Sequence, residues 1–380
     1  MSVRSFLPRA PRTLALTCAL TCALLYPTGC LREGRDRALG DLEIGADEAD
    51  SVAFTSRDGL AHIRDLTDGT LSMWASAPVV EITLTAEPDA RLDWTIDIEN
   101  CMPGAELISD RIDVLTRPLG GPRPTICQFS LTLPTITTGE PLTTTLLLAP
   151  PDAGLNAPFR FAAMSDVQNG IDEVDDVFAT INADPSIRFV ISTGDLTSNA
   201  TPGQYNTWLD KLRTLDVPFF ATIGNHELFG DLGLWRRYFG RVSVNFQFQG
   251  AHFSLVDSAS ASIDPMVYDW LDEWIVAAKD TVHVFATHYP PTDPVGIRNG
   301  SFRSRNEASK LIGKLAAGGV DLTIYGHIHT YYGYTNGDIP AHISGGGGAF
   351  QERWDGVGRH VLAVDVNPTG ISQVTVVEVD

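Results

Sequence analysis

Side chains that can bind metal ions gather in five short clusters between residues 166 and 329. In order they are Asp166-Val167-Gln168, Gly194-Asp195, Gly224-Asn225-His226-Glu227, His288, and Gly326-His327-Ile328-His329. They offer carboxylate, amide and imidazole ligands, which suit divalent transition metals. Two such ions held about 3.5–4 Å apart generate a hydroxide at neutral pH and compensate the charge of phosphoryl oxygens. The clusters therefore predict a dinuclear centre for phosphoester hydrolysis.

Each cluster stands where a short apolar run gives way to a loop. The runs cover residues 159–166, 189–195, 219–225, 282–288 and 322–327, and helical or mixed segments separate them. Strands that alternate with helices indicate a layered α/β domain. Because loops after neighbouring strands meet at one edge of a sheet, the five clusters are expected to converge there.

Helix start signals support this organisation. Thr201-Pro202 and Asp264-Pro265 each combine a capping side chain with a proline at the first helical position, and each precedes residues that share one apolar face. A third helix is expected over about residues 306–317, and closing strands are expected at 341–344 and near Val361 and Val374.

The part before residue 150 follows a different pattern. The runs 79–84, 92–98, 126–131 and 142–148 alternate apolar with polar residues and are separated by Pro and Gly, which predicts an antiparallel β-sandwich. The paired prolines Pro150 and Pro151 indicate a domain boundary. We therefore expect an accessory β-sandwich over residues 51–150 and a catalytic domain over residues 155–380.

The first 30 residues read as an export signal, in which three arginines precede a short apolar run that ends near Cys30. Small residues before Cys30 resemble a bacterial lipobox, although Pro27 stands where an aliphatic residue is usual. Lipidation of Cys30, ordinary cleavage nearby and an uncleaved anchor all remain open. Residues 31–50 are expected to form a flexible tether. The predicted location is the bacterial periplasm or cell surface.

Two further features concern the compartment and the partners. Cys101 and Cys127 would pair in an oxidising compartment, the alternative being two free thiols. The formal net charge of −20 makes nucleic acid an unexpected partner, and solubility is the simplest reason for it. A membrane is expected as a partner only through a lipid on Cys30.

The order of the clusters makes residues 159–330 resemble the calcineurin-like metallophosphoesterase family, whose usual motifs are Asp-x-His, Gly-Asp, Gly-Asn-His-Glu or Asp, His, and Gly-His-x-His. The resemblance implies a four-layer fold with two sheets between helices. It implies an enzyme that hydrolyses a phosphomonoester or a phosphodiester. It also implies two groups of metal ligands joined by one carboxylate. The first group is Asp166, Gln168 and His329, the second is Asn225, His288 and His327, and Asp195 bridges them.

The same resemblance makes His226 the group that protonates the leaving alkoxide or stabilises the transition state, and the near-neutral pKa of imidazole suits this duty. Glu227 would orient His226 without binding metal. Three arginines after His288 are candidates for binding the substrate phosphate: Arg298, Arg303 and Arg305. The alternative for them is a solvated loop.

Gln168 departs from the family pattern, which most often has histidine there, and an amide oxygen binds such metals more weakly. Ser198 stands where purple acid phosphatases, which are similar in carrying an N-terminal β-domain, place a tyrosine ligand. We therefore expect Mn²⁺, Zn²⁺ or Fe²⁺ and no ferric centre. Gln168 also supports a rival hypothesis, a non-catalytic surface lipoprotein that keeps the fold as a binding scaffold.

Overall fold

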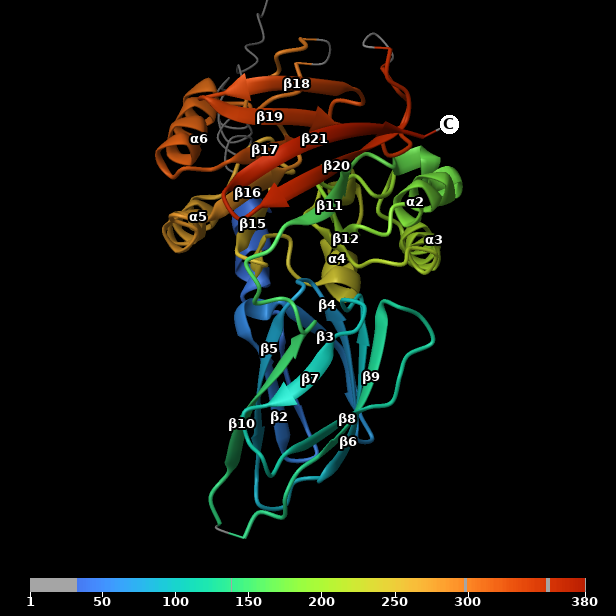
Figure 1. Ribbon diagram of the computed structural model, residues 1–380, viewed down its shortest axis with the longest axis vertical. Coiled ribbons are helices and arrows are strands. Elements are labelled where there is room, and N and C mark those ends of the chain that lie inside the picture. The colour runs from blue at the N-terminus through green and yellow to red at the C-terminus, as the bar shows by residue number, and fades with distance from the viewer. Residues whose placement is uncertain (1–32, 138, 297–298, 353–355, 380) are drawn as a thin grey trace, which may run out of the picture.

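The computed structural model describes residues 33–137, 139–296, 299–352 and 356–379. The expected signal segment and Cys30 lie outside the described residues. Two domains follow one another along the long axis of the molecule, an N-terminal β-domain and a larger α/β domain (Figure 1).

The β-domain consists of two five-stranded sheets that face each other. One sheet has the order β1-β2-β5-β10-β7, and the other has the order β3-β4-β6-β9-β8. The strands are β1 (Ala46–Ala49), β2 (Val52–Ser56), β3 (Ala61–Thr67), β4 (Thr70–Ala75), β5 (Val80–Ala86), β6 (Asp93–Glu99), β7 (Glu106–Ser109), β8 (Leu115–Pro118), β9 (Ile126–Thr132) and β10 (Leu142–Ala149), with a short 3₁₀ helix η1 (Arg57–Gly59) after β2. Alternate residues such as Ile82, Leu84, Ile96 and Ile98 fill the core between the sheets.

One strand pair departs from the antiparallel sandwich expected from the sequence. β4 and β6 run parallel to each other, with Leu71 opposite Ile96. The chain leaves this sheet after β4, forms β5 in the facing sheet and then returns as β6. Because a single strand in the other sheet separates them, β4 and β6 point the same way.

The second domain contains two sheets flanked by helices. The sheets have the orders β13-β12-β11-β20-β21 and β14-β15-β16-β17-β19-β18. The strands are β11 (Phe159–Met164), β12 (Ile187–Ser192), β13 (Phe219–Ala221), β14 (Val244–Phe248), β15 (Ala251–Val256), β16 (Val282–Thr287), β17 (Leu322–Tyr325), β18 (Tyr331–Asn336), β19 (Ile339–Ser344), β20 (His360–Asn367) and β21 (Gly370–Glu378). The helices are η2 (Gln168–Glu173), α2 (Val174–Asn182), α3 (Pro202–Leu212), η3 (His226–Phe229), α4 (Leu232–Phe239), α5 (Pro265–Ala277) and α6 (Arg305–Ala317).

Three apolar clusters define four layers. Phe161, Phe189 and Phe253 belong to the cluster between the two sheets. On the other face of the first sheet, Ala162 and Val190 pack against α2, α3 and α4. The second sheet is covered by α5 and α6 through residues that include Leu271, Leu311 and Leu315. This confirms the expected fold class, and the helices begin as predicted, with Thr201 capping α3 and Asp264 capping α5.

The two domains are joined by buried polar contacts. The side chain of Asn100, after β6, binds the backbone of Phe219 through both amide atoms, at 2.8 Å from its nitrogen and 2.7 Å from its oxygen. The Ser76 hydroxyl donates to the carbonyl of Phe239 at 3.0 Å. These bonds place the β-domain against β13, a strand whose following loop carries Asn225.

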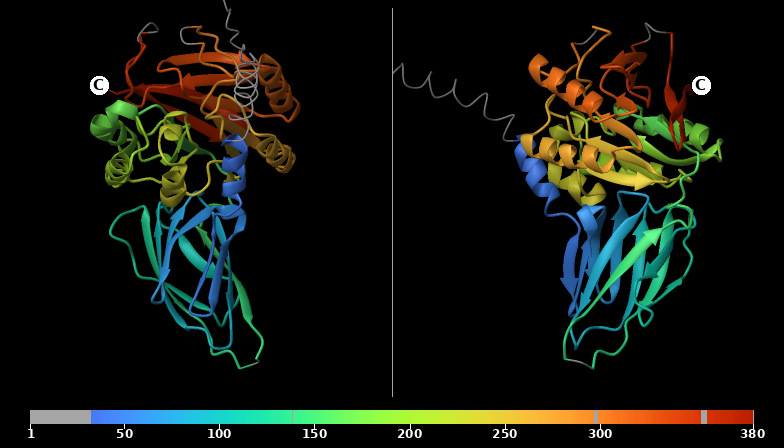
Figure 2. Two further views of the ribbon diagram at one scale, coloured as in Figure 1. Left: turned by 180° about the vertical axis from the view of Figure 1, so that it is seen from behind. Right: turned by 60° about the vertical axis from the view of Figure 1, so that its left-hand side comes forward.

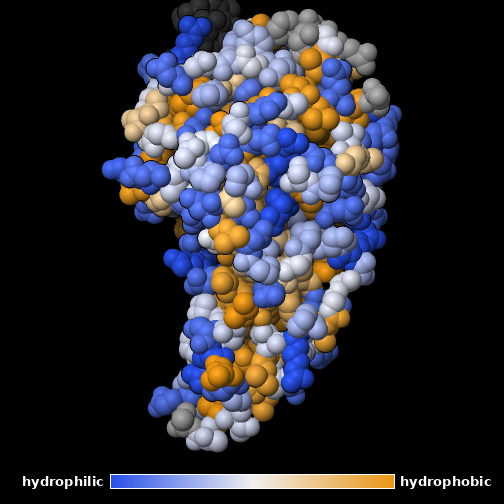
Figure 3. Space-filling model, viewed as in Figure 1, coloured by the Kyte–Doolittle hydropathy of each residue, from blue (hydrophilic) through white to orange (hydrophobic). Residues whose placement is uncertain are grey.

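Cys101 and Cys127 form a disulfide that links the ends of β6 and β9 in the β-domain. On the outer face of the same domain, Ile108 of β7 and Leu147 of β10 are paired and both exposed, and Figure 3 shows hydrophobic atoms where these strands run. Within the described residues, no helix is both long and apolar enough to span a membrane.

The expectation of a flexible tether over residues 31–50 is wrong for the part that the structure describes. Residues 33–41 are helical and lie against the catalytic domain (Figure 2). Arg37 is 3% exposed and pairs with Asp257 at 2.6 Å, and Asp41 accepts the backbone N–H groups of Val242 and Ser243 at 3.0 Å each. Sequence reasoning read the charged residues as solvated because their buried partners lie about 200 residues further along the chain.

Replacing Arg37 with methionine is expected to lower the free energy of unfolding by about 3–5 kcal/mol, because it leaves the buried carboxylate of Asp257 without its cation. The matched control is Arg35→Met, because the Arg35 side chain is 46% exposed and its contact with Asp264 spans 3.5 Å, so that its loss should cost less than about 1 kcal/mol. Urea unfolding of both variants measures the difference. Equal stability of the two would show that residues 33–41 do not support the fold.

Burial raises the pKa of Asp41 to about 7 from an ordinary value of 3.8, against the opposing effect of its two backbone hydrogen bonds. Between these values the folded chain holds a proton that the unfolded chain has lost, so stability falls as pH rises from about 4 to about 7. The change is on the order of 4 kcal/mol. Unfolding at several pH values should show this slope in the native chain and a smaller slope in Asp41→Asn. Identical slopes would contradict the assignment.

Candidate metal centre

The five clusters meet where strands of both central sheets end. Four of the residues involved adopt positive φ angles: Asp166 (60°), Gln168 (46°), Asp195 (56°) and His327 (69°). Such backbone is strained for residues other than glycine and is retained mainly at functional sites. The glycines between them permit close approach, since a Cβ on Gly224 would lie 2.1 Å from Asp195 Oδ1 and one on Gly326 2.2 Å from Ser165 Oγ.

The first group of predicted ligands lies together after β11 and β17. His329 Nε2 is 3.4 Å from Asp166 Oδ1 and 3.2 Å from Gln168 Nε2. All three side chains are buried. The Gln168 amide nitrogen also donates to Asp195 Oδ2 at 2.8 Å, which joins this group to the carboxylate predicted to bridge the two groups.

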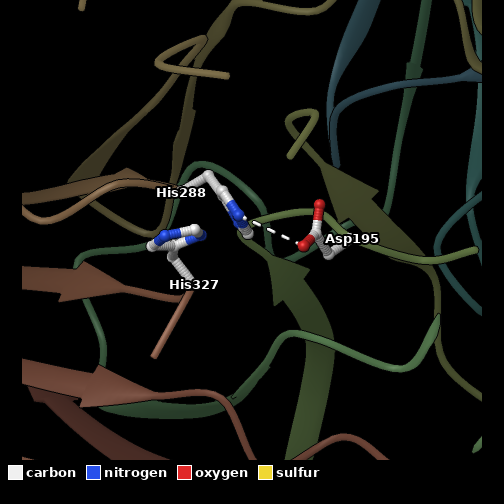
Figure 4. A group of neighbouring side chains, drawn as sticks. All are labelled: Asp195, His288 and His327. Carbon is white, nitrogen blue, oxygen red and sulfur yellow. Dashed lines mark ion pairs between the residues drawn. The ribbon is translucent and has the colours of Figure 1, made fainter. Parts of the chain in front are cut away.

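The second group lies on the other side of Asp195. His288 Nε2 is 3.4 Å from Asp195 Oδ2 and 3.0 Å from Asn225 Oδ1. Potential ligand atoms of Asp195, His288 and His327 lie within 4.8 Å of one another, and Figure 4 shows the two imidazoles beside the carboxylate. The structure therefore brings together all seven side chains that the sequence predicted as ligands, with Asp195 between the two groups.

The arrangement fits divalent cations. Asp166 Oδ1 is buried and has no hydrogen-bond partner among the described residues, which leaves a carboxylate oxygen for a positive ligand. Two imidazoles have their Nδ1 atoms occupied by backbone carbonyls, His288 by Thr193 at 2.9 Å and His329 by Phe350 at 3.0 Å. Those bonds fix the tautomer that leaves Nε2 for a metal.

Charge within the cluster is balanced in a way that favours ionised carboxylates. Burial alone would raise the pKa of Asp166 and of Asp195, yet the neighbouring imidazoles hold both values below the ordinary one. Burial would lower the pKa of His288, but the charge of Asp195 and other carboxylates raises it to about 9. The carboxylates thus attract positive charge, which bound cations would supply.

Glu227 plays a different part from the one expected. It was predicted to orient His226, but its buried carboxylate accepts backbone N–H groups of Asp195 at 2.8 Å, Leu196 at 2.9 Å and Gly224 at 2.8 Å. The side chain of His226 is held instead by the carbonyl of Ser198, 2.7 Å from Nδ1. Glu227 therefore ties together two ligand-bearing loops, and burial followed by the charge of Asp195 raises its pKa to about 7.

His226 lies at the mouth of the cluster. Its side chain is 26% exposed, whereas that of Asp195 is 1% exposed, and its Nε2 is 3.9 Å from Asp195 Oδ2. Because Nδ1 is bound to Ser198, Nε2 is the nitrogen that faces the site. It is placed to exchange a proton with a group bound beside Asp195 and is accessible to solvent.

Sequence reasoning missed two elements of the site. The centre of the Tyr289 ring lies 3.8 Å from the centre of the His327 ring, so the tyrosine covers one face of a predicted ligand. The loop after β19 supports the first group, since the N–H of Gly347 binds the carbonyl of Ser165 and that of Ala349 binds the carbonyl of Asp166, each at 2.8 Å. The four consecutive glycines at 345–348 were a signal for such close packing.

The structure does not show whether the three arginines predicted to bind phosphate lie together. Arg298 lies outside the described residues, and Arg303 and Arg305 occupy exposed positions at the start of α6. Their role in binding substrate stays a prediction.

Residues 159–331 match the model of the calcineurin-like phosphoesterase family. The chain therefore carries a calcineurin-like phosphoesterase domain, and the resemblance drawn from the motifs is confirmed.

Individual relatives are distant. A 3',5'-cyclic-nucleotide phosphodiesterase of Nostoc sp. is 24% identical over 153 residues, 38% of this chain and 57% of that protein. A probable glycerophosphodiester phosphodiesterase of Arcobacter nitrofigilis is 25% identical over 163 residues, 39% of this chain and 59% of that protein. The matches thus span less than two thirds of these relatives. A purple acid phosphatase from yellow lupin is 13% identical, with a TM-score of 0.48 over 79% of this chain and 72% of that structure.

Proposed function

We propose that the protein is a metal-dependent phosphohydrolase that uses two divalent ions to cleave a phosphomonoester or phosphodiester. The observation that carries the proposal is the convergence of six other proposed ligand side chains around Asp195, with His226 Nε2 3.9 Å from the same carboxylate. A metal site beside an accessible imidazole is the arrangement that hydrolysis with an alkoxide leaving group requires.

The residues of the chain divide the work. One ion would be held by Asp166, Gln168 and His329. The other would be held by Asn225, His288 and His327, and Asp195 would contribute to both sites. His226 Nε2 would give its proton to the leaving alcohol as the bond from phosphorus to that oxygen breaks, while the hydroxyl of one water is added to phosphorus. The other proton of that water would be released to solvent, from which His226 would be reprotonated. Glu227 would keep the loops of Asp195 and Asn225 in register.

When bound, the two ions would supply Lewis acidity and lower the pKa of a water molecule. Oxygen and imidazole ligands suit Mn²⁺, Zn²⁺ or Fe²⁺. Ser198 cannot supply a phenolate, so a ferric centre with a tyrosine ligand is not proposed at this position.

The first test is hydrolysis of paired chromogenic phosphomonoester and phosphodiester substrates by the purified chain. Chelated protein is expected to be inactive, and Mn²⁺ should restore turnover, because the ions supply the nucleophile. Asp272→Ala, an exposed carboxylate on α5, is the control for loss of a negative charge and should behave as the native chain. A folded protein without turnover on either ester under Mn²⁺ would contradict the proposal for these substrates.

The rival hypothesis of a non-catalytic scaffold rests on Gln168, which stands where the family pattern most often has histidine. Its amide nitrogen donates to Asp195 Oδ2 at 2.8 Å and lies 3.2 Å from His329 Nε2. Binding metal requires a half-turn of this amide. The number of ions per chain separates the hypotheses: two ions support the enzyme, none supports the scaffold, and one would indicate that the first position has been lost.

We further propose that the chain is exported and that, if it is attached to a membrane, the attachment is a lipid on Cys30. The basic and apolar start of the sequence and the disulfide in the β-domain support this. Detergent partitioning of the native chain and of Cys30→Ser, expressed with the full signal, tests it. Retention in the membrane fraction that does not depend on Cys30 would contradict a lipid anchor.

A further inference from the structure

The protein buries nearly all of its phenylalanines, and the exceptions border the metal-ligand cluster. Of seventeen phenylalanines, Phe6 lies outside the described residues, and all the others except Phe229 and Phe350 are buried. These two are 65% and 81% exposed. Aromatic side chains beside a few convergent polar groups are typical of the lining of small-molecule binding sites.

Phe229 lies beside the residue proposed to protonate the leaving group. It ends η3, the short helix that begins with His226, and the centres of the two rings are 4.9 Å apart. The next residue is packed closely, since a Cβ on Gly230 would lie 2.3 Å from the carbonyl oxygen of Ala200. The ring of Phe229 is thus attached to a fixed backbone and faces solvent next to His226.

Phe350 belongs to the opposite end of the cluster. Its carbonyl accepts the hydrogen bond from His329 Nδ1, and the adjacent Ala349 binds the backbone of Asp166. Glu352 N–H also binds the carbonyl of His329 at 2.8 Å. The first group of ligands therefore carries an exposed aromatic residue of its own, and the two phenylalanines flank the seven ligands.

We propose that the natural substrate is a phosphoester whose leaving alcohol carries a planar aromatic group, and that this group packs against Phe229. The inference rests on the proposed function, because the role of His226 places the leaving oxygen, and so the group attached to it, beside Phe229. Aromatic rings in offset or edge-to-face contact attract one another beyond their apolar burial. Such a contact would add affinity for the alcohol part of the substrate without requiring a positively charged side chain.

An unreactive pair of ligands tests the inference apart from catalysis. Phenylphosphonate and methylphosphonate carry the same anionic group and differ by the ring. Calorimetry with the Mn²⁺-loaded protein is expected to give a dissociation constant about fivefold to tenfold lower for phenylphosphonate, as an aromatic pair predicts. The preference should fall below about twofold in Phe229→Leu, which keeps an apolar side chain, and should persist in Phe229→Tyr. Val276→Ala, 73% exposed on α5, is the control for loss of a surface apolar group.

Kinetics then distinguish the two sources of an aromatic leaving alcohol. Phenyl phosphate represents a simple aryl group, a nucleoside 5'-monophosphate represents a nucleobase, and glycerol phosphate has no ring. Phe229→Leu should lower the kcat/KM of one or both aromatic esters about fivefold relative to glycerol phosphate, through KM. Equal binding of the two phosphonates, or a preference unchanged in Phe229→Leu, would overturn the inference while leaving hydrolysis intact. Absence of hydrolysis with every ester would overturn the proposed function and this inference with it.

Discussion

Replacing Asp195 with alanine should lower kcat/KM by a factor of about 10³ or more, the largest effect expected of any single substitution, because metal ligands provide both the nucleophile and the charge compensation. Asp195 contacts both ligand groups, through Gln168 at 2.8 Å and His288 at 3.4 Å. Its other oxygen accepts the backbone N–H of His226 at 2.8 Å, so the substitution also frees the loop of the proposed acid.

Metal content gives the Asp195 prediction a second readout. The variant should bind fewer than two ions per chain, while its circular dichroism remains that of the native protein. Asp272→Ala should keep both the activity and the ions. An Asp195→Ala protein that is folded, binds two ions and turns over at the native rate would show that the cluster is not the active site.

Replacing His226 with glutamine should lower kcat by about 10²–10⁴-fold, the usual contribution of a general acid, and leave metal binding unchanged. The size of the loss should depend on the leaving group. A nitrophenolate leaves without protonation, so its ester should be affected little, whereas an alkyl ester should show the full loss. Only a proton donor to the leaving oxygen gives this dependence.

His62→Gln is the matched control for His226, because His62 lies in the β-domain and binds the carbonyl of Arg237 through Nε2. It should not alter the rate with either ester. If His226→Gln slowed both esters equally, His226 would act by stabilising charge on the phosphoryl group instead of by protonation.

The catalytic domain was readily predicted because its signals are local. Each ligand cluster directly follows an apolar strand, and a strand end fixes the place of a loop without knowledge of distant contacts. Capping residues such as Thr201 and Asp264 act within a few residues of themselves, and both helices begin where these residues stand. Periodicity and caps therefore located most strands and two helix starts, and the resemblance of the motifs selected the seven side chains that the structure brings together.

The errors concern contacts between residues far apart in the chain. The charge of Arg37 reads as solvated until Asp257 is placed beside it. The role of Glu227 depended on which of several nearby N–H groups its carboxylate would reach, and Asp195, Leu196 and Gly224 come together only in the folded domain. The parallel pair of β4 and β6 depended on which sheet β5 joins, a choice that the pattern within a strand does not contain.

The docking of residues 33–41 has a consequence for how the molecule would stand on a surface. Arg35 and Arg37 attach the start of the described chain to Asp264 and Asp257 of the catalytic domain, while the β-domain forms the far end of the molecule (Figure 1). If Cys30 carries a lipid, only two residues separate it from this helix. The enzyme domain would then lie next to the bilayer, and the β-domain would point outward as the part that neighbouring macromolecules meet first.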